Sequence, residues 1–263
     1  MSSELVARVL SGIVVVALTL GTGYLGGWWF VALLLSALVL ATRELWRLLR
    51  AAGYHPDLGF MMLTITAAFI SVRFSDLQLL APALSLALLS SLAWQLYRAD
   101  HRTIGDWAVG FAGGFYLGWT AGHLAGLREL EDGWWWLVLT LGSVWTADSA
   151  AFVVGRLLGR RWLAPRISPA KTWEGYWGGS VCSALVGLAV GAGSPISWPV
   201  GLLCGALIGS LSVFGDLIES MLKRQAHAKD SGHLIPGHGG VLDRIDSVLW
   251  AGVIAFYVQK FVG

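Results

Sequence analysis

Carboxylates, cations and glycines gather near the C-terminal end of a chain that is otherwise strongly apolar. Residues 229–246 read KDSGHLIPGHGGVLDRID and hold three aspartates, two histidines, four glycines and two basic residues. Just upstream, four polar side chains share one face of a predicted helix at the spacing i, i+3, i+4 and i+7: Asp216, Glu219, Ser220 and Lys223. Carboxylates this close repel one another unless cations lie between them, and their oxygens suit Mg²⁺ or a similar ion.

Basic residues accompany these carboxylates in greater number than neutralisation alone requires. They are Lys171, Lys223, Arg224, Lys229 and Arg244. Acidic groups beside clustered cations are typical of sites for a metal-bound phosphate, and glycines such as Gly239 and Gly240 let backbone amides approach phosphate oxygens. His238, between two glycines, is a candidate ligand for phosphate or a base. Two alternatives stay open: carboxylates paired with cations for structure alone, and a tight turn that closes onto the last helix.

A second polar cluster reads ISPAKTWEG, residues 167–175. Thr172 is predicted to cap the next helix, with Glu174 in its first turn. Capping and membrane topology alone would account for this stretch. For Lys171 we expect a further role, the binding of a phosphate group.

The elements that must position these residues are long apolar runs. Of the 263 residues, 56% are hydrophobic and 13% are charged, and the mean hydropathy is +0.67. Runs of about 20 apolar residues predict transmembrane helices. We therefore predict an all-α, polytopic integral membrane protein with a single domain over residues 1–263, in which residues 1–130 are a scaffold and residues 131–263 are catalytic. The nine predicted helices are 5–23, 27–49, 58–73, 77–97, 105–126, 134–158, 173–193, 198–223 and 246–262.

Charge alternates between the joints of these helices. Basic residues concentrate at the even joints, for example Arg43, Arg47 and Arg50 at the second, whereas the odd joints are poor in cations. Lysine and arginine are retained on the cytoplasmic side, so the N-terminus and both polar clusters are predicted to be cytoplasmic. The same confinement indicates topology rather than nucleic-acid binding. Carboxylates inside apolar runs are costly and therefore candidate functional residues; they are Asp148 in the sixth run and Asp216 near the end of the eighth.

Glycines recur every fourth residue in two helices. Gly110, Gly114, Gly118, Gly122 and Gly126 form one series, and Gly201, Gly205 and Gly209 form another. Small residues at this spacing let a second helix approach closely. We predict that both series are helix–helix packing faces.

The run from Ser220 to Asp246, SMLKRQAHAKDSGHLIPGHGGVLDRID, resembles the C-terminal signature of the phosphatidate cytidylyltransferases, also called CDP-diacylglycerol synthases. The pattern is Ser-x-apolar-Lys-Arg, four residues, Lys-Asp, then Pro-x-His-Gly-Gly and Asp-Arg-x-Asp, without a departure. TADSAAFVVGR around Asp148 and the SPAKTWEG run also look like short stretches of that family. The resemblance covers residues 140–263, and the N-terminal half is similar only in being helical and membrane-embedded.

The resemblance implies a reaction in phospholipid biosynthesis. CTP and phosphatidic acid would give CDP-diacylglycerol and pyrophosphate, with Mg²⁺, alone or with a second cation, in a dimeric enzyme of the bacterial inner membrane whose site faces the cytoplasm. Catalysis would rest on Lys171, Asp216, Asp243 and Asp246. The metal would be held by Asp148, Asp216, Asp243 and Asp246. The substrates would be bound by Ser168, Lys171, Thr172, Ser220, Lys223, Arg224, Lys229, His238, Gly239, Gly240 and Arg244.

Two other classes of protein share part of this pattern. A CTP-dependent polyprenol kinase would make the same demands on nucleotide and membrane but would transfer the γ-phosphate. A secondary transporter also keeps carboxylates in membrane helices, although internal repeats with matching broken helices would then be expected. We find no such repeats in the sequence, and the polar residues lie at one predicted boundary rather than at the midplane.

Overall fold

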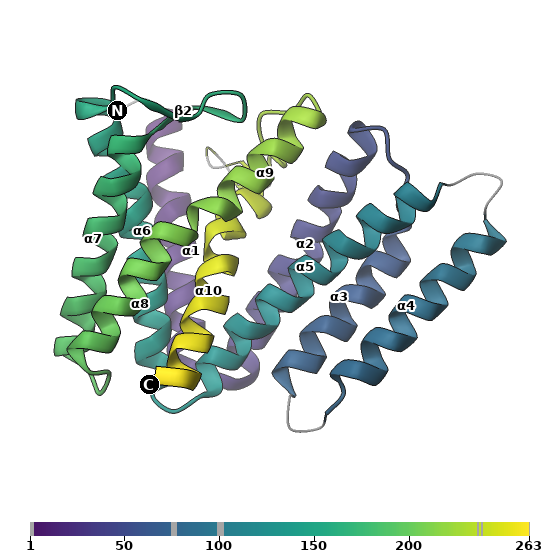
Figure 1. The fold of residues 1–263 in the computed structure, drawn as a ribbon, viewed down its shortest axis with the longest axis horizontal. Coiled ribbons are helices and arrows are strands. Elements are labelled where there is room, and N and C mark those ends of the chain that lie inside the picture. The colour runs from purple at the N-terminus through teal and green to yellow at the C-terminus, as the bar shows by residue number, and fades with distance from the viewer. Residues whose placement is uncertain (1–2, 75–77, 99–102, 236, 238, 263) are drawn as a thin grey trace. The chain divides into compact units, whose positions relative to one another are not determined.

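The computed structural model describes residues 3–74, 78–98, 103–235, 237 and 239–262, and the regular elements among them are helices and one short β-hairpin, joined by loops (Figure 1). The first helices are α1 (Ser3–Leu25), α2 (Gly27–Ala51), α3 (Leu58–Arg73), α4 (Leu80–Tyr97) and α5 (Ile104–Glu129). The later elements are α6 (Gly133–Leu158), β1 (Trp162–Ala164), β2 (Ser168–Thr172), α7 (Trp173–Ala192), α8 (Trp198–Leu211), α9 (Val213–Gln225) and α10 (Leu242–Val262).

Within the described residues, six helical segments are long and apolar enough to cross a membrane: Gly27–Ala51, Leu80–Tyr97, Gly133–Leu158, Trp173–Ala192, Trp198–Gln225 and Leu242–Val262. This composition makes the chain a polytopic integral membrane protein, as the hydropathy predicted. Two details differ from the prediction. The helix predicted at 198–223 is interrupted at Ser212, which separates α8 from α9. The last helix begins at Leu242 instead of residue 246, so that Asp243 lies in its first turn.

The chain divides into two compact units, each built from segments that are distant in sequence. The first unit comprises Met1–Thr22, Trp28–Gly126 and Leu222–Arg244. The second comprises Gly23–Gly27, Leu127–Met221 and Ile245–Gly263. Residues 131–263, predicted to carry the chemistry, therefore contribute to both units.

In the first unit, the glycine series of α5 packs against α3. A Cβ atom on Gly114 would lie 2.9 Å from the carbonyl oxygen of Met61, and one on Gly118 would lie 2.4 Å from that of Ile65. Neither separation is possible for a real side chain, so these two helices touch backbone to backbone. The predicted packing face is confirmed for this part of the series.

The Gly118→Ala substitution is therefore expected to destabilise the protein. The added methyl group collides with backbone, which cannot rotate away as a side chain can, and overpacking of this kind costs about 1–3 kcal/mol. Gly21→Ala is the matched control, because a Cβ at Gly21 meets no atom within 4 Å. Alanine is the better helix former, so Gly21→Ala should leave stability unchanged or raise it by up to about 1 kcal/mol. Thermal unfolding in detergent measures both, and a Gly118→Ala protein at least as stable as the wild type would contradict the packing argument.

In the second unit, α7 packs against both α6 and α8 (Figure 1). The second glycine series forms the α7–α8 contact, since a Cβ on Gly201 would lie 2.3 Å from the carbonyl oxygen of Gly187. Ser183 strengthens the contact by donating its hydroxyl to the carbonyl oxygen of Gly205 at 2.7 Å. This packing face, too, is confirmed.

The hairpin of β1 and β2 leads directly into α7. The two strands are antiparallel, with Trp162 opposite Thr172 and Ala164 opposite Ser168. Thr172 is the N-cap of α7, and its Oγ1 accepts a hydrogen bond from the Gly175 amide at 3.1 Å. The predicted cap is confirmed. The strands were not predicted. They hold Lys171 directly before Thr172, the N-cap of α7.

Candidate active site

Lys171 and Asp216 form an ion pair in the second unit. Lys171 lies on β2 and Asp216 in the first turn of α9, and the lysine Nζ is 2.7 Å from the aspartate Oδ2. The other carboxylate oxygen, Oδ1, accepts a hydrogen bond from Ser220 one helical turn further on, at 3.0 Å. Both side chains of the ion pair remain partly exposed, at 24% for Lys171 and 34% for Asp216. The pair is thus oriented by the protein and still accessible to a ligand.

Further carboxylates belong to the same neighbourhood. Asp246, in α10, and Glu219, in α9, are both buried and lie close to one another. Asp246 also feels the negative charges of Asp216 and of Asp148, the exposed aspartate of α6. We call Asp148, Asp216, Glu219 and Asp246 the carboxylate cluster. The sequence predicted that three of its members act together, and the structure brings Asp148, Asp216 and Glu219 to the neighbourhood of Asp246.

Gly215 is the reason that Asp216 and Asp246 can lie close together. A Cβ at position 215 would be 2.4 Å from the carbonyl oxygen of Asp246 and 2.8 Å from Cδ1 of Trp250. The backbones of α9 and α10 therefore meet at this glycine. Its neighbour in the chain, Asp216, is brought to the same crossing.

The donor set of the carboxylate cluster fits Mg²⁺ in its chemistry. Among the described residues, no three aspartate, glutamate, histidine or cysteine side chains surround one point as a ready-made metal cage. Mg²⁺ does not require such a cage, because it is usually bound through one or two carboxylates, with water and substrate phosphates as the remaining ligands. Asp216 and Asp246 are the pair that suits this mode, since they approach one another and a cation would relieve their repulsion.

Asp243 occupies a different environment, in the first unit. Its Oδ1 accepts from Lys223 Nζ at 2.6 Å. Its Oδ2 accepts from the Ser231 amide at 2.9 Å, the Ser231 hydroxyl at 3.0 Å and the Gly240 amide at 2.8 Å. The side chain is only 6% exposed. Asp243 thus ties the end of α9 and the following loop to the start of α10.

The glycines of this loop are required by its shape. Gly239 has φ +82°, in the region that favours glycine, and a Cβ there would lie 2.6 Å from Oδ2 of Asp243. The Ile235 amide donates to the Gly239 carbonyl oxygen at 3.0 Å, which closes the predicted turn. His238, the predicted ligand within this turn, lies outside the described residues. The turn alternative is therefore correct, and it leaves a role in binding open because both can hold at once.

The remaining predicted residues lie at the surface or in local contacts. Arg224, Lys229 and Arg244 are exposed, and Ser168 is half-buried at the start of β2. The hydroxyl of Thr172 is engaged in the α7 cap. The structure therefore assembles two groups, one around Asp216 and one around Asp243.

Glu44 of α2 is a residue that the sequence analysis missed. It is 4% exposed and accepts hydrogen bonds from the loop that precedes α10. Its sequence context, ATRELWRLLR, contains three arginines and had been read only as a basic joint. A lone carboxylate among apolar and basic residues of a membrane helix was the signal available.

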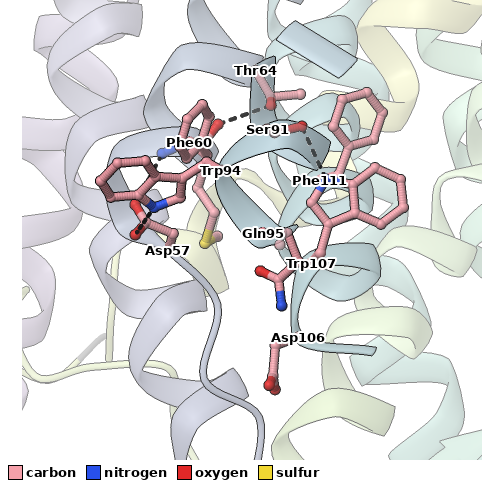
Figure 2. A pocket seen from close by; sticks show the side chains of 11 residues that line it. Asp57, Phe60, Thr64, Ser91, Trp94, Gln95, Asp106, Trp107 and Phe111 are labelled. Atoms are coloured by element: carbon pink, nitrogen blue, oxygen red, sulfur yellow. Dashed lines mark hydrogen bonds between the residues drawn. The ribbon is translucent and has the colours of Figure 1, made fainter. Parts of the chain in front are cut away.

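A separate pocket of the first unit lies between α3, α4 and α5 (Figure 2). It contains none of the predicted site residues. Some of its polar groups form hydrogen bonds from one helical segment to another. Trp94 Nε1 donates to Asp57 at 3.3 Å, and Trp107 Nε1 donates to Ser91 Oγ at 2.9 Å. We interpret it as a crevice of helix packing.

Fold and site together define an integral membrane protein with a polar site of carboxylates and lysines at the ends of apolar helices. Residues 6–262 match the model of the cytidylyltransferase family. The chain is 38% identical to the phosphatidate cytidylyltransferase of Pseudomonas aeruginosa, over 92% of each chain. It is 36% identical to that of Brucella suis, over 97% of this chain and 93% of the other, and 33% identical to that of Synechocystis sp., over 95% and 94%. The chain belongs to the cytidylyltransferase family.

Proposed function

We propose that this protein is a membrane-bound phosphatidate cytidylyltransferase, which makes CDP-diacylglycerol and pyrophosphate from CTP and phosphatidic acid. The observation that carries the proposal is the Lys171–Asp216 pair beside buried carboxylates, in a chain that matches the family over nearly its whole length. The product is a precursor in phospholipid biosynthesis. Family membership and the full-length relatives support the same reaction.

In this reaction an oxygen of the lipid phosphate forms a bond to the α-phosphorus of CTP. The bond from that phosphorus to the bridging oxygen of the β-phosphate breaks, and its electron pair leaves with pyrophosphate. The lipid phosphate is itself the nucleophile, so no serine or cysteine nucleophile is needed. The barrier comes from bringing two anions together, which fixed cations and exact positioning reduce.

The residues divide this work by their chemistry. Lys171 neutralises phosphate charge from a strand that fixes its position, and Ser220 orients the Asp216 carboxylate. Asp216 and Asp246 are the residues that would hold Mg²⁺, which when bound supplies charge neutralisation and alignment of the phosphates. Lys223, Arg224, Lys229 and Arg244 are proposed to bind the nucleotide phosphates, together with the amide of Gly239, since the Gly240 amide donates to Asp243.

The setting of the site follows from its substrates. The acyl chains remain in the bilayer while the head group reaches polar residues at the membrane boundary. CTP is a cytoplasmic solute, so the proposal includes a cytoplasmic site, a cytoplasmic N-terminus and nine membrane-crossing segments in a bacterial inner membrane. A homodimer is part of the same proposal, on the strength of the family resemblance.

Isotope placement tests the reaction. Purified protein is supplied with phosphatidic acid, Mg²⁺ and CTP that is labelled at either the α- or the γ-phosphate. We expect the label to enter the lipid from the α-phosphate only. Label from the γ-phosphate would instead identify a lipid kinase, and transport of a solute without nucleotide consumption would reject both enzyme functions.

Omitting Mg²⁺ should abolish incorporation, and full incorporation without a divalent cation would overturn the metal assignment.

A further inference from the structure

Glu44 is a buried carboxylate whose hydrogen bonds all run to one distant loop. Its Oε1 accepts from the Val241 amide at 3.0 Å, and its Oε2 accepts from the Leu242 amide at 2.8 Å and from the Ser231 hydroxyl at 3.0 Å. These partners lie close to 200 residues further along the chain and belong to the same compact unit. A buried carboxylate is tolerated only when such donors replace water. The side chain and the loop therefore stabilise each other.

The two amides belong to the start of α10. The first N–H groups of a helix have no acceptor within the helix, and an anion placed there also interacts favourably with the helix dipole. Usually a side chain just before the helix supplies this acceptor. Here Glu44 supplies it from α2, so the N-terminus of α10 is capped by a different segment of the chain.

Ser231 connects Glu44 to Asp243. The Ser231 hydroxyl lies 3.0 Å from Oε2 of Glu44 and 3.0 Å from Oδ2 of Asp243. Asp243 is further held by the Gly240 amide and by Lys223. The orientation of Asp243 thus depends on the loop, and the conformation of the loop depends on Glu44.

Two glycines of the loop lie directly against the Glu44 carboxylate. A Cβ on Gly232 would be 2.6 Å from Oε1, and a Cβ on Gly240 would be 2.5 Å from Oε2. The loop therefore encloses the carboxylate at a distance that no larger residue allows. Gly240, whose amide donates to Asp243, is thereby fixed in place by Glu44.

We propose that Glu44 is a positioning residue: it holds residues 229–243 and the N-terminus of α10 in the conformation that binds the phosphates of CTP. The inference rests on the proposed function for its substrate, and on the hydrogen bonds above for its structure. Glu44 touches no substrate in this role. It acts through Ser231, through Gly240 and through the first amides of α10.

Hydrogen exchange tests the structural half without reference to activity. In the Glu44→Gln protein, a side-chain NH2 group replaces one of the two carboxylate oxygens. This group cannot accept a hydrogen bond, so one of the backbone amides of Val241 and Leu242 loses its acceptor. We expect amide exchange across residues 229–243 to speed up by about tenfold or more, because the loop opens locally, while exchange in α6–α8 stays unchanged. Asp57→Asn is the matched control, since Asp57 also caps a helix in this unit, accepting from the Gly59 and Phe60 amides, but lies on α3. Equal protection of the loop in Glu44→Gln and wild type would overturn the proposal.

Steady-state kinetics test the functional half. We expect Glu44→Gln to raise the KM for CTP by about fivefold or more while the KM for phosphatidic acid stays within about twofold. A merely structural loss leaves fewer active molecules and moves neither KM, so an unchanged KM for CTP in a folded, less active variant would contradict the positioning role.

If Glu44→Gln does not fold, Ser231→Ala serves instead. It removes the hydroxyl that bridges Glu44 and Asp243 but keeps the contacts of Glu44 to both backbone amides, and it should also raise the KM for CTP. A wild-type protein that makes no CDP-lipid would refute the proposed function, whereas the exchange experiment would still decide whether Glu44 holds the loop.

Discussion

Asp216→Asn should lower the turnover number for CDP-diacylglycerol formation by about 100-fold to 1,000-fold, the usual loss when one preorganised electrostatic group of an active site is removed. Asparagine has nearly the same shape and can still accept the hydrogen bond from Ser220, so the local structure should persist. What disappears is the negative charge that pairs with Lys171 and that would attract Mg²⁺. Turnover at saturating CTP, measured over a range of Mg²⁺ concentrations, checks this expectation.

Asp132→Asn is the matched control for Asp216→Asn. Asp132 is the residue before α6 and has φ +54°, a conformation that asparagine adopts readily, and its side chain makes no capping hydrogen bond. It belongs to the same unit but not to the carboxylate cluster. Turnover should remain within about twofold of wild type, as for most surface substitutions. A folded Asp216→Asn enzyme with the same activity as this control would remove Asp216 from the mechanism.

Lys171→Met is expected to have the second-largest effect, a loss of about 100-fold in kcat/KM for CTP. Methionine keeps the length of the side chain and removes the only charge, so Asp216 loses its 2.7 Å partner and the phosphates lose a cation. Lys171→Arg should recover part of this activity, because arginine keeps the charge but replaces a point charge with a planar group. Arg166→Met on the same hairpin is the control, since Arg166 is exposed between the two strands.

A double variant distinguishes a working pair from two independent residues. If Lys171 and Asp216 act as one unit, Lys171→Met combined with Asp216→Asn should lose little more activity than the worse single variant. Losses that multiply would show that each residue contributes separately. In that case the ion pair seen in the structure would have no part in turnover.

Local features of the fold were predictable because their causes are local. The Thr172 cap needs only a threonine ahead of a helix, and the contacts of Gly118 and Gly201 need only the fourfold spacing that puts small residues on one face. The hairpin before α7 escaped prediction for the opposite reason. Strands of three and five residues are too short to establish an alternating pattern.

The interruption at Ser212 and the early start of α10 show how apolar sequence conceals helix ends. The run through 198–223 carries no proline near Ser212 and no charge before Asp216, so its hydropathy predicts one continuous span. Asp243 was placed ahead of the last helix because it is polar, whereas its carboxylate accepts from the Gly240 amide and so supports the first turn. A polar residue at a helix start is compatible with the helix when it satisfies free amides.

The site was only partly predictable, since its members meet through tertiary structure. The importance of Asp216 could be predicted from the cost of a carboxylate within an apolar helix. The close approach at Gly215 that brings Asp216 and Asp246 together could not. The sequence around Glu44 shows a lone carboxylate in a membrane helix, but its partners could not be predicted, because they are nearly 200 residues away. The half of the chain predicted to be a scaffold thus contributes a residue to the loop before α10.

The Lys171–Asp216 ion pair also has a thermodynamic consequence. An anion that binds Lys171 must compete with Asp216, and a cation that binds Asp216 must compete with Lys171. Each ligand therefore releases the residue that the other requires, so that occupancy by either one strengthens the affinity for the other by the same factor. If the proposed function holds, this salt bridge makes nucleotide and metal cooperative ligands, and it disfavours a site that holds only one of them.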